Sequence, residues 1–363
     1  MTMTDAEPFT DDVHAVAAHY GVAEKDVVPV PTQGQVNVTV FLGDELVLRI
    51  PRTPAAAEQL AKEADVIPLV RDAGVPTPEL VRYDASSSVV RVPYMVLQRV
   101  HGTTLAEQPP GSAERRCALG SLGEILASLH QIRYSAVEPI GAIPEPFTFS
   151  PSELLGRLLD AGEIGSAQHE WLGEQFALLQ PEGPSQADPV LLHRDVIPAN
   201  VMVDRGGRVS AMLDWGCAEW GSPARDLVGL PIRELPDLLS GYRSAQGVAP
   251  PADEAGGSLA LERDALWYHL YLALARLMKE PSTSEDRNWA APRSATLLEL
   301  LAFTADAAPE SWSMHLRRKS LGTTPRPRCW TRPSGGAEAR PRHESAPRGA
   351  RDAGSPATDD RAP

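Results

Sequence analysis

Cysteine is scarce in this sequence of 363 residues, and its three copies lie far apart: Cys117, Cys217 and Cys329. No two of them form a CxxC pair, which argues against a zinc site and against a disulfide framework. We therefore expect a reducing compartment, the cytoplasm. The first twelve residues carry acids where a secretory signal carries basic residues followed by an apolar stretch. Export is not expected.

A long hydrophobic run is also lacking. The longest apolar stretch, residues 266–278, is about 13 residues long and includes His269 and Arg276, whereas a membrane-spanning helix needs about 20 apolar residues. This stretch predicts a buried helix, and we expect no membrane partner.

Positive charge is sparse over most of the chain. The net charge is −14, but residues 1–308 hold 23 Lys and Arg against 42 Asp and Glu, a net charge of −19, whereas residues 309–363 hold 11 basic against 6 acidic residues. An acidic body repels nucleic acid and anionic membranes and attracts cationic small molecules. We expect a cationic small-molecule partner and no nucleic-acid partner, and the oligomeric state stays open.

A small sheet-rich lobe is predicted after an N-terminal segment, 1–23. In residues 24–101, β-branched residues alternate and turns fall at Gly34 and Gly43, which predicts strands. One helix follows with a threonine cap and a proline at its first position, and it ends near Gly74. This lobe therefore combines a sheet with a single internal helix.

A mainly helical lobe is predicted over residues 102–308. Apolar residues recur there at helical spacing, notably near 233–246, 258–280 and 294–307. Residues 309–363 contain 8 prolines and almost no apolar periodicity, so we expect a disordered tail. The fold class predicted for the whole chain is α+β in two lobes.

The stretch LLHRDVIPANVMVD, residues 191–204, places polar residues between two short predicted strands. Asp195 could accept a proton from an attacking hydroxyl, and Asn200 could bind a metal through its side-chain oxygen. A further apolar strand ends at Asp214, a second carboxylate near the same loop, as a Mg²⁺ ion bridging two phosphates requires. Because aspartate also forms turns and caps, Asp195 and Asn200 alone carry little weight, and the joint pattern carries the prediction.

The spacing H-R-D-x4-N, followed by D-W-G and by GSPARDL at 221–227, resembles the aminoglycoside phosphotransferases and their relatives, which include macrolide and choline kinases. The family commonly has H-G-D, so Arg194 departs from its pattern. Protein kinases lack the GSPARDL segment, which favours the small-molecule branch. The resemblance implies a two-lobed, protein-kinase-like fold, with a small antiparallel-sheet N-lobe that carries one helix and a larger, mainly helical C-lobe.

The same resemblance implies a role for each polar residue of the pattern. Asp195 would be the catalytic acceptor of the hydroxyl proton. Asn200 and Asp214 would hold magnesium. His193 and Asp226 would brace the catalytic loop by hydrogen bonds.

Nucleotide-binding residues are implied in the N-lobe and at its end: Gly34, Asn37, Arg49, Glu63, Gln98 and Val100. Gly34 and Asn37 match the G-x-x-N of the family, although a plain hairpin has the same residues and a G-x-G-x-x-G loop is missing. Arg49 would hold the α and β phosphates, paired with Glu63, or the two form an ordinary ion pair between a strand and a helix. Gln98 and Val100 would offer backbone groups to adenine, unless the segment that holds them is only an edge strand.

We expect an enzyme that uses ATP, or GTP, with Mg²⁺ to phosphorylate a hydroxyl group of a small molecule. An aminoglycoside or related cationic antibiotic suits the acidic body, so the expected outcome is antibiotic resistance. A macrolide is the alternative, because Trp171, Trp220, Trp267 and Tyr268 could line a less polar cleft. Kinases of homoserine, choline or a sugar stay open, as does a nucleotide-binding module of this fold without turnover.

Overall fold

The computed structural model describes residues 9–31, 34, 36–136, 149–180, 189–247, 259–278 and 294–312. Its N-terminal lobe is built on a five-stranded antiparallel sheet with the order β1-β2-β3-β5-β4. The strands are β1 (Val27–Pro29), β2 (Asn37–Leu42), β3 (Leu46–Pro51), β4 (Leu80–Asp84) and β5 (Tyr94–Gln98). The predicted turn at Gly43 joins β2 to β3, and its φ of 62° is one that glycine adopts without steric cost.

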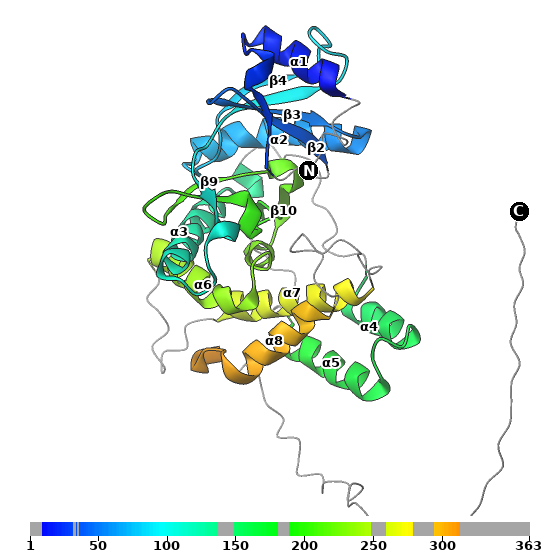
Figure 1. Ribbon diagram of the computed structural model, residues 1–363. Coiled ribbons are helices and arrows are strands. Elements are labelled where there is room, and N and C mark those ends of the chain that lie inside the picture. The colour runs from blue at the N-terminus through cyan, green and yellow to red at the C-terminus, as the bar shows by residue number, and fades with distance from the viewer. Residues whose placement is uncertain are drawn as a thin grey trace, which may run out of the picture. The chain divides into compact units, whose positions relative to one another are not determined.

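One helix covers each face of this sheet (Figure 1). Side chains along a strand alternate between the two faces, and β5 buries both of its own. Val96 belongs to the cluster that includes Val16 of α1 (Thr10–His19), and Met95 belongs to the cluster that includes α2 (Pro54–Asp72). Burial on both sides fixes the position of β5 and of the segment that leaves it.

Helix α2 is the helix that the sequence predicted. The Thr53 hydroxyl accepts a hydrogen bond from the Ala56 amide at 3.2 Å, Pro54 is the first helical residue, and Gly74 ends the turn with a φ of 78°. Helix α1 was not predicted, because the sequence of residues 1–23 gave no assigned structure. Its buried residues, which include Val13 and Val16, pack on the sheet.

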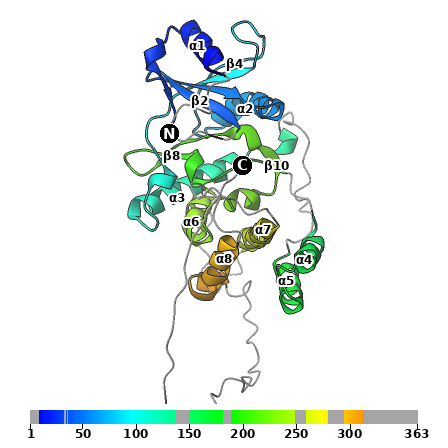
Figure 2. The ribbon, with the colours of Figure 1, turned by 45° about the vertical axis from the view of Figure 1, so that its right-hand side comes forward.

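The C-terminal lobe is mainly helical, as predicted, and carries two small sheets. The short strands pair as β6-β8-β9 and as β10-β7. Its helices are α3 (Ala113–Leu129), α4 (Pro151–Asp160), α5 (Ser166–Leu179), α6 (Leu235–Ala245), α7 (Ala260–Leu277) and α8 (Ala295–Asp306). Its strands are β6 (Thr103–Thr104), β7 (Val190–Leu192), β8 (Val201–Val203), β9 (Val209–Met212) and β10 (Glu219–Gly221). Figures 1 and 2 show α4 and α5 side by side and next to α7.

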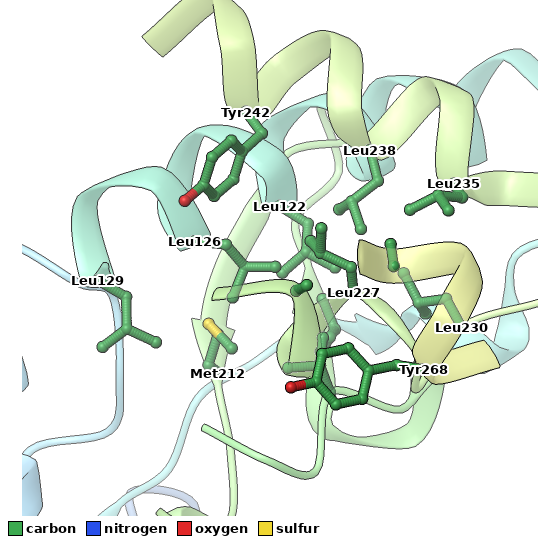
Figure 3. Close-up of a cluster of buried hydrophobic side chains, with 14 of the residues drawn as sticks. Leu122, Leu126, Leu129, Met212, Leu227, Leu230, Leu235, Leu238, Tyr242 and Tyr268 are labelled. Atoms are coloured by element: carbon green, nitrogen blue, oxygen red, sulfur yellow. The ribbon is translucent and has the colours of Figure 1, made fainter. Parts of the chain in front are cut away.

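Helices α3 and α6 form the platform beneath the short strands, and their backbones approach closely. A Cβ atom on Gly241 of α6 would lie 1.9 Å from the Gly120 carbonyl oxygen, and one on Gly123 of α3 would lie 2.0 Å from that of Leu238. Only glycine allows such contact. Leucines of both helices point into one cluster with Met212 of β9, shown in Figure 3.

A short hydrogen-bonded contact joins the end of α2 to β9. The Met212 amide donates to the Pro76 carbonyl at 2.9 Å, and the Thr77 hydroxyl donates to the Met212 carbonyl at 3.1 Å. Trp215, fully buried, donates its indole N–H to the Thr77 hydroxyl at 2.8 Å. The N-lobe helix is thereby fixed to the segment that carries Asp214.

The first residues of the predicted tail continue the packing of the C-lobe. Trp312 is 3% exposed, and its ring centroid lies 5.8 Å from that of Phe303 on α8. Residues 313–363, and with them most of the predicted tail, lie outside the described residues. No helix in the described part of the chain is both long and apolar enough to span a membrane.

Candidate active site

The loop between β7 and β8 brings Asp195 and Asn200 together. The Asn200 side-chain N–H donates to the Asp195 carboxylate at 2.8 Å and to the Asp195 carbonyl at 3.0 Å. A 3₁₀ turn, Pro198–Asn200, folds the chain back so that the Asn200 side chain reaches Asp195. The Asn200 carbonyl in turn accepts from the Leu213 amide at 2.8 Å, so the residue before Asp214 is held against the same loop.

Asp226 anchors the other end of the loop from a buried position. Its carboxylate accepts from the amides of His193 at 2.8 Å and Arg194 at 2.7 Å. Burial alone would raise the pKa of Asp226, but the hydrogen bond and charge of His130 and the contacts with His193 outweigh it and hold the pKa below its usual range. An ionised, fully hydrogen-bonded carboxylate at this place gives the loop one geometry.

His193 is a buried structural residue. Its Nε2 lies 2.9 Å from the Leu213 carbonyl, which can only accept, and its Nδ1 lies 3.3 Å from the Asp195 amide, which can only donate. The ring is therefore protonated at Nε2 alone. Burial lowers the pKa of His193, in agreement with a neutral ring.

Asp214 stands at the junction of the two lobes, in a left-handed backbone conformation with a φ of 67°. Its carboxylate accepts from the Arg49 guanidinium at 3.0 Å, and the same guanidinium donates to both Glu63 oxygens at 2.6 Å. The Trp215 amide also donates to Glu63, at 3.2 Å. Burial alone would lower the pKa of Arg49, but the charges of Glu63 and Asp214 outweigh it and raise the pKa.

Asp195 lies within range of the charge on Asp214. Burial raises the pKa of the Asp195 carboxyl, and the Asp214 carboxylate raises it further, while His193, Asn200 and Arg194 lower it. A raised pKa makes Asp195 a stronger base for a hydroxyl proton than an exposed aspartate is. The carboxylate therefore suits proton acceptance.

The donor set at this place fits a magnesium ion. The Asn200 amide nitrogen is engaged by Asp195, so its oxygen is left for a cation, and the Asp214 side chain is 45% exposed. In the described ranges, no group of three or more His, Cys, Asp or Glu could hold a metal. An ion held by one amide and one carboxylate would need oxygens of water and phosphate, and magnesium usually binds in that manner.

The remaining predicted nucleotide residues lie apart from this network. Gly34 is exposed, and its neighbours 32, 33 and 35 lie outside the described residues. Asn37 begins β2; it is 6% exposed, and its side-chain oxygen has no hydrogen-bond partner within the described structure. The Gln98 amide already donates to the Glu79 carbonyl at 2.9 Å, which leaves Gln98 its carbonyl as a backbone contact. Val100 is half-buried just past β5.

A family model described as "Phosphotransferase enzyme family" matches residues 27–256. The chain belongs to this phosphotransferase family. It is 27% identical over 169 residues to the aminoglycoside 3'-phosphotransferase of Streptomyces fradiae, an alignment that covers 46% of this chain and 62% of that enzyme. The chain thus spans about three fifths of the length of that relative.

Two solved structures show that the fold is that of kinase-like phosphotransferases. The GDP complex of aminoglycoside 2'-phosphotransferase-IIIa has a TM-score of 0.55 and 18% identity, covering 80% of this chain and 96% of that chain. Macrolide 2'-phosphotransferase type I has a TM-score of 0.53 and 22% identity, covering 82% and 98%. The predicted α+β, two-lobed, kinase-like fold is confirmed.

Two polar contacts of this candidate site, one at His130 and one at Glu219, were not predicted from the sequence. His130, at the end of α3, bridges the Asp226 carboxylate at 3.1 Å and the Tyr242 hydroxyl of α6 at 2.9 Å. Arg194 and Arg225 both bind the Glu219 carboxylate. The signal for His130 was a single histidine at the apolar end of a helix, which has no distinctive spacing.

Proposed function

We propose that this member of the phosphotransferase family transfers the γ-phosphoryl group of ATP, or of GTP, to a hydroxyl group of a small-molecule antibiotic. One observation carries the proposal: Asp195, Asn200 and Asp214 converge beside the Arg49–Glu63 pair. Phosphoryl transfer depends mainly on positioning and charge stabilisation, which such a set of groups supplies.

Asp195 is the proposed catalytic residue. The acceptor oxygen forms a bond to the γ-phosphorus, the bond from that phosphorus to the bridging oxygen breaks, and the hydroxyl proton passes to Asp195. The nucleoside diphosphate leaves with the bonding electrons. Asn200 holds the carboxylate by its hydrogen bond at 2.8 Å, so that the base is oriented before the acceptor arrives.

Asn200 and Asp214 are the proposed magnesium ligands, and the ion would screen the charge of the β and γ phosphates. Arg49 would bind the α and β phosphates, and its hydrogen bonds to Glu63 and Asp214 fix the orientation of the guanidinium. His193 and Asp226 are proposed to act only on the loop, because both are buried. Gly34, Asn37, Gln98 and Val100 complete the proposed nucleotide site.

An aminoglycoside or related cationic antibiotic is the acceptor that the charge favours. Residues 1–308 have a net charge of −19, and exposed acids stand on α5 and before it, among them Glu163, Glu170 and Glu174. Glu153 is bound into the cap of α4 at Ser150, and Glu219 is bound by two arginines. The resemblance to the Streptomyces fradiae enzyme supports this acceptor class.

A macrolide is the second candidate, supported by the likeness of fold to macrolide 2'-phosphotransferase type I. The aromatic residues that suggested an apolar cleft give it less support. Trp220 is fully buried, Trp267 and Tyr268 are each 9% exposed, and only Trp171 of that set is exposed, at 40%. The first three therefore belong mainly to the core.

The N-lobe 24–101 and C-lobe 102–308, preceded by segment 1–23 and followed by tail 309–363, remain our proposed division of the chain. A cytoplasmic location is proposed from the scattered cysteines and the acidic N-terminus. No partner of nucleic acid or membrane is proposed, since the body of the protein is acidic.

A nucleotide-consumption screen tests the proposal. The purified chain is supplied with ATP or GTP, Mg²⁺ and separate panels of aminoglycosides, peptide antibiotics, macrolides and primary alcohol metabolites, and products are examined by mass spectrometry. We expect one acceptor class to gain a phosphoryl group. Nucleotide binding without transfer to any acceptor would instead identify a binding module that has kept the fold.

A further inference from the structure

Backbone strain concentrates at the proposed site. In the described part of the chain, three residues other than glycine have positive φ: Ser87 at 60°, Arg194 at 71° and Asp214 at 67°. Two of these three stand in the catalytic and metal-binding segments. A left-handed conformation costs an L-residue free energy that glycine does not lose, and the family commonly has glycine where Arg194 stands.

The side chain of Arg194 makes a contact that glycine would lack. Its Nε donates to the Glu219 carboxylate, and the Arg225 guanidinium lies 2.5 Å from the same oxygen. Glu219 belongs to β10 and stands opposite Leu192, which directly precedes the catalytic loop. The Arg194 amide donates to Asp226 at 2.7 Å. Arg194 is therefore held at its backbone and at its tip, immediately before Asp195.

We propose that Arg194 is a positioning residue, whose bond to Glu219 holds the left-handed turn that aims the Asp195 carboxylate at the acceptor hydroxyl. The inference rests on the proposed phosphotransfer for its kinetic consequence only. Strain persists where surrounding contacts outweigh it, commonly at functional sites.

Glycine substitutions at Arg194 and at Ser87 together distinguish the loss of the Arg194 side chain from the relief of backbone strain. Arg194→Gly relieves the backbone and removes the side chain, whereas Ser87→Gly relieves a backbone of similar φ in a turn remote from the site. In Arg194→Gly the lost ion pair and the relieved strain oppose each other, and Ser87→Gly loses no ion pair. We expect the Tm of both variants to stay within about 3 °C of the parent. A change in rate confined to Arg194→Gly then reports on position rather than on folding.

With the acceptor found in the screen, we expect Arg194→Gly to lower kcat about tenfold or more while KM for the nucleotide changes less than about twofold. Glu219→Gln should also lower kcat, because the Arg194 side chain loses the carboxylate that holds it. Ser87→Gly should match the parent.

Hydrogen exchange of the loop amides keeps the inference testable if no acceptor is ever phosphorylated. Arg194→Gly and Glu219→Gln should both speed exchange at the backbone amides of His193, of Asp195 and of the residue between them, and Ser87→Gly should not. If the screen finds no phosphorylated acceptor but the two variants exchange their loop amides faster than the parent, only the proposed function is overturned. Parental kcat, or parental exchange where no activity exists, in Arg194→Gly would overturn the positioning role.

Discussion

The loop that carries Asp195 and the two helices that precede it in the chain, α4 and α5, are built by different means. Around Asp195 and Asp226, nearly every polar group has a short, directed partner, and the anchoring carboxylate is buried. On α4 and α5 the buried residues are leucines and a phenylalanine, while Glu170 and Trp171 face solvent. The first region is fixed mainly by directed hydrogen bonds, and the second mainly by apolar packing, with hydrogen bonds at its helix caps.

This difference suggests that the reaction and the choice of acceptor depend on different parts of the protein. Directed bonds permit one geometry, so the reaction that Asp195 and Asp214 can perform follows from a few residues. Packing of α4 and α5 tolerates many surface side chains, because exposed positions contribute little to the fold. We therefore expect substitutions on the exposed faces of α4 and α5 to leave the geometry of the loop that carries Asp195 unchanged.

The largest expected effect is on Asp195. Asp195→Asn should lower kcat by a factor of about 10² to 10⁴, because an amide cannot accept the hydroxyl proton. The control is Asp72→Asn, the same change on an exposed residue at the end of α2. Steady-state kinetics with thermal denaturation would decide the point: an active Asp195→Asn variant would remove this residue from the mechanism.

The platform formed by α3 and α6 should be far less tolerant of an added methyl group than α5 is. Gly241→Ala places a Cβ 1.9 Å from the Gly120 carbonyl oxygen, where backbone must move, so the free energy of unfolding should fall by about 3 kcal/mol. Gly173→Ala on α5 meets nothing within 4 Å and should be neutral or stabilising by up to about 1 kcal/mol. Denaturant unfolding of both variants would show equal stability if the comparison is wrong.

The prediction from sequence was strongest where residue spacing reflects directed bonds. Asp195, Asn200 and Asp214 have the fixed offsets of a known family, and the structure brings them together with Arg49 and Glu63. The threonine cap at the start of α2 and the glycine after its end were also recognisable in the sequence. Helix α1, the bridge at His130 and the pairing of Arg194 with Glu219 depend on partners far away in the chain. The local sequence around each of these residues does not indicate which distant residue it contacts.

Acid should weaken the packed helices through a buried histidine. Burial lowers the pKa of His269 on α7 from 6.5 to about 4, so the unfolded chain binds the proton more readily than the folded chain between these values. Its contribution to stability is complete above pH 6.5 and is lost as the pH falls toward 4, up to about 3 kcal/mol. Unfolding free energies measured across this range should therefore fall less steeply in His269→Gln than in the parent.

The smallest effect is expected on the acceptor side itself. Glu170 is exposed on α5, and an exposed ion pair contributes only about 0.2 to 1 kcal/mol. Glu170→Gln should therefore raise KM for a cationic acceptor by no more than about fivefold and leave kcat unchanged. The matched control is Glu58→Gln on α2, an exposed acid of the N-lobe. A loss of kcat in Glu170→Gln would mean that α5 carries part of the catalytic geometry. In that case the division between a directed catalytic loop and a merely packed acceptor surface would not hold.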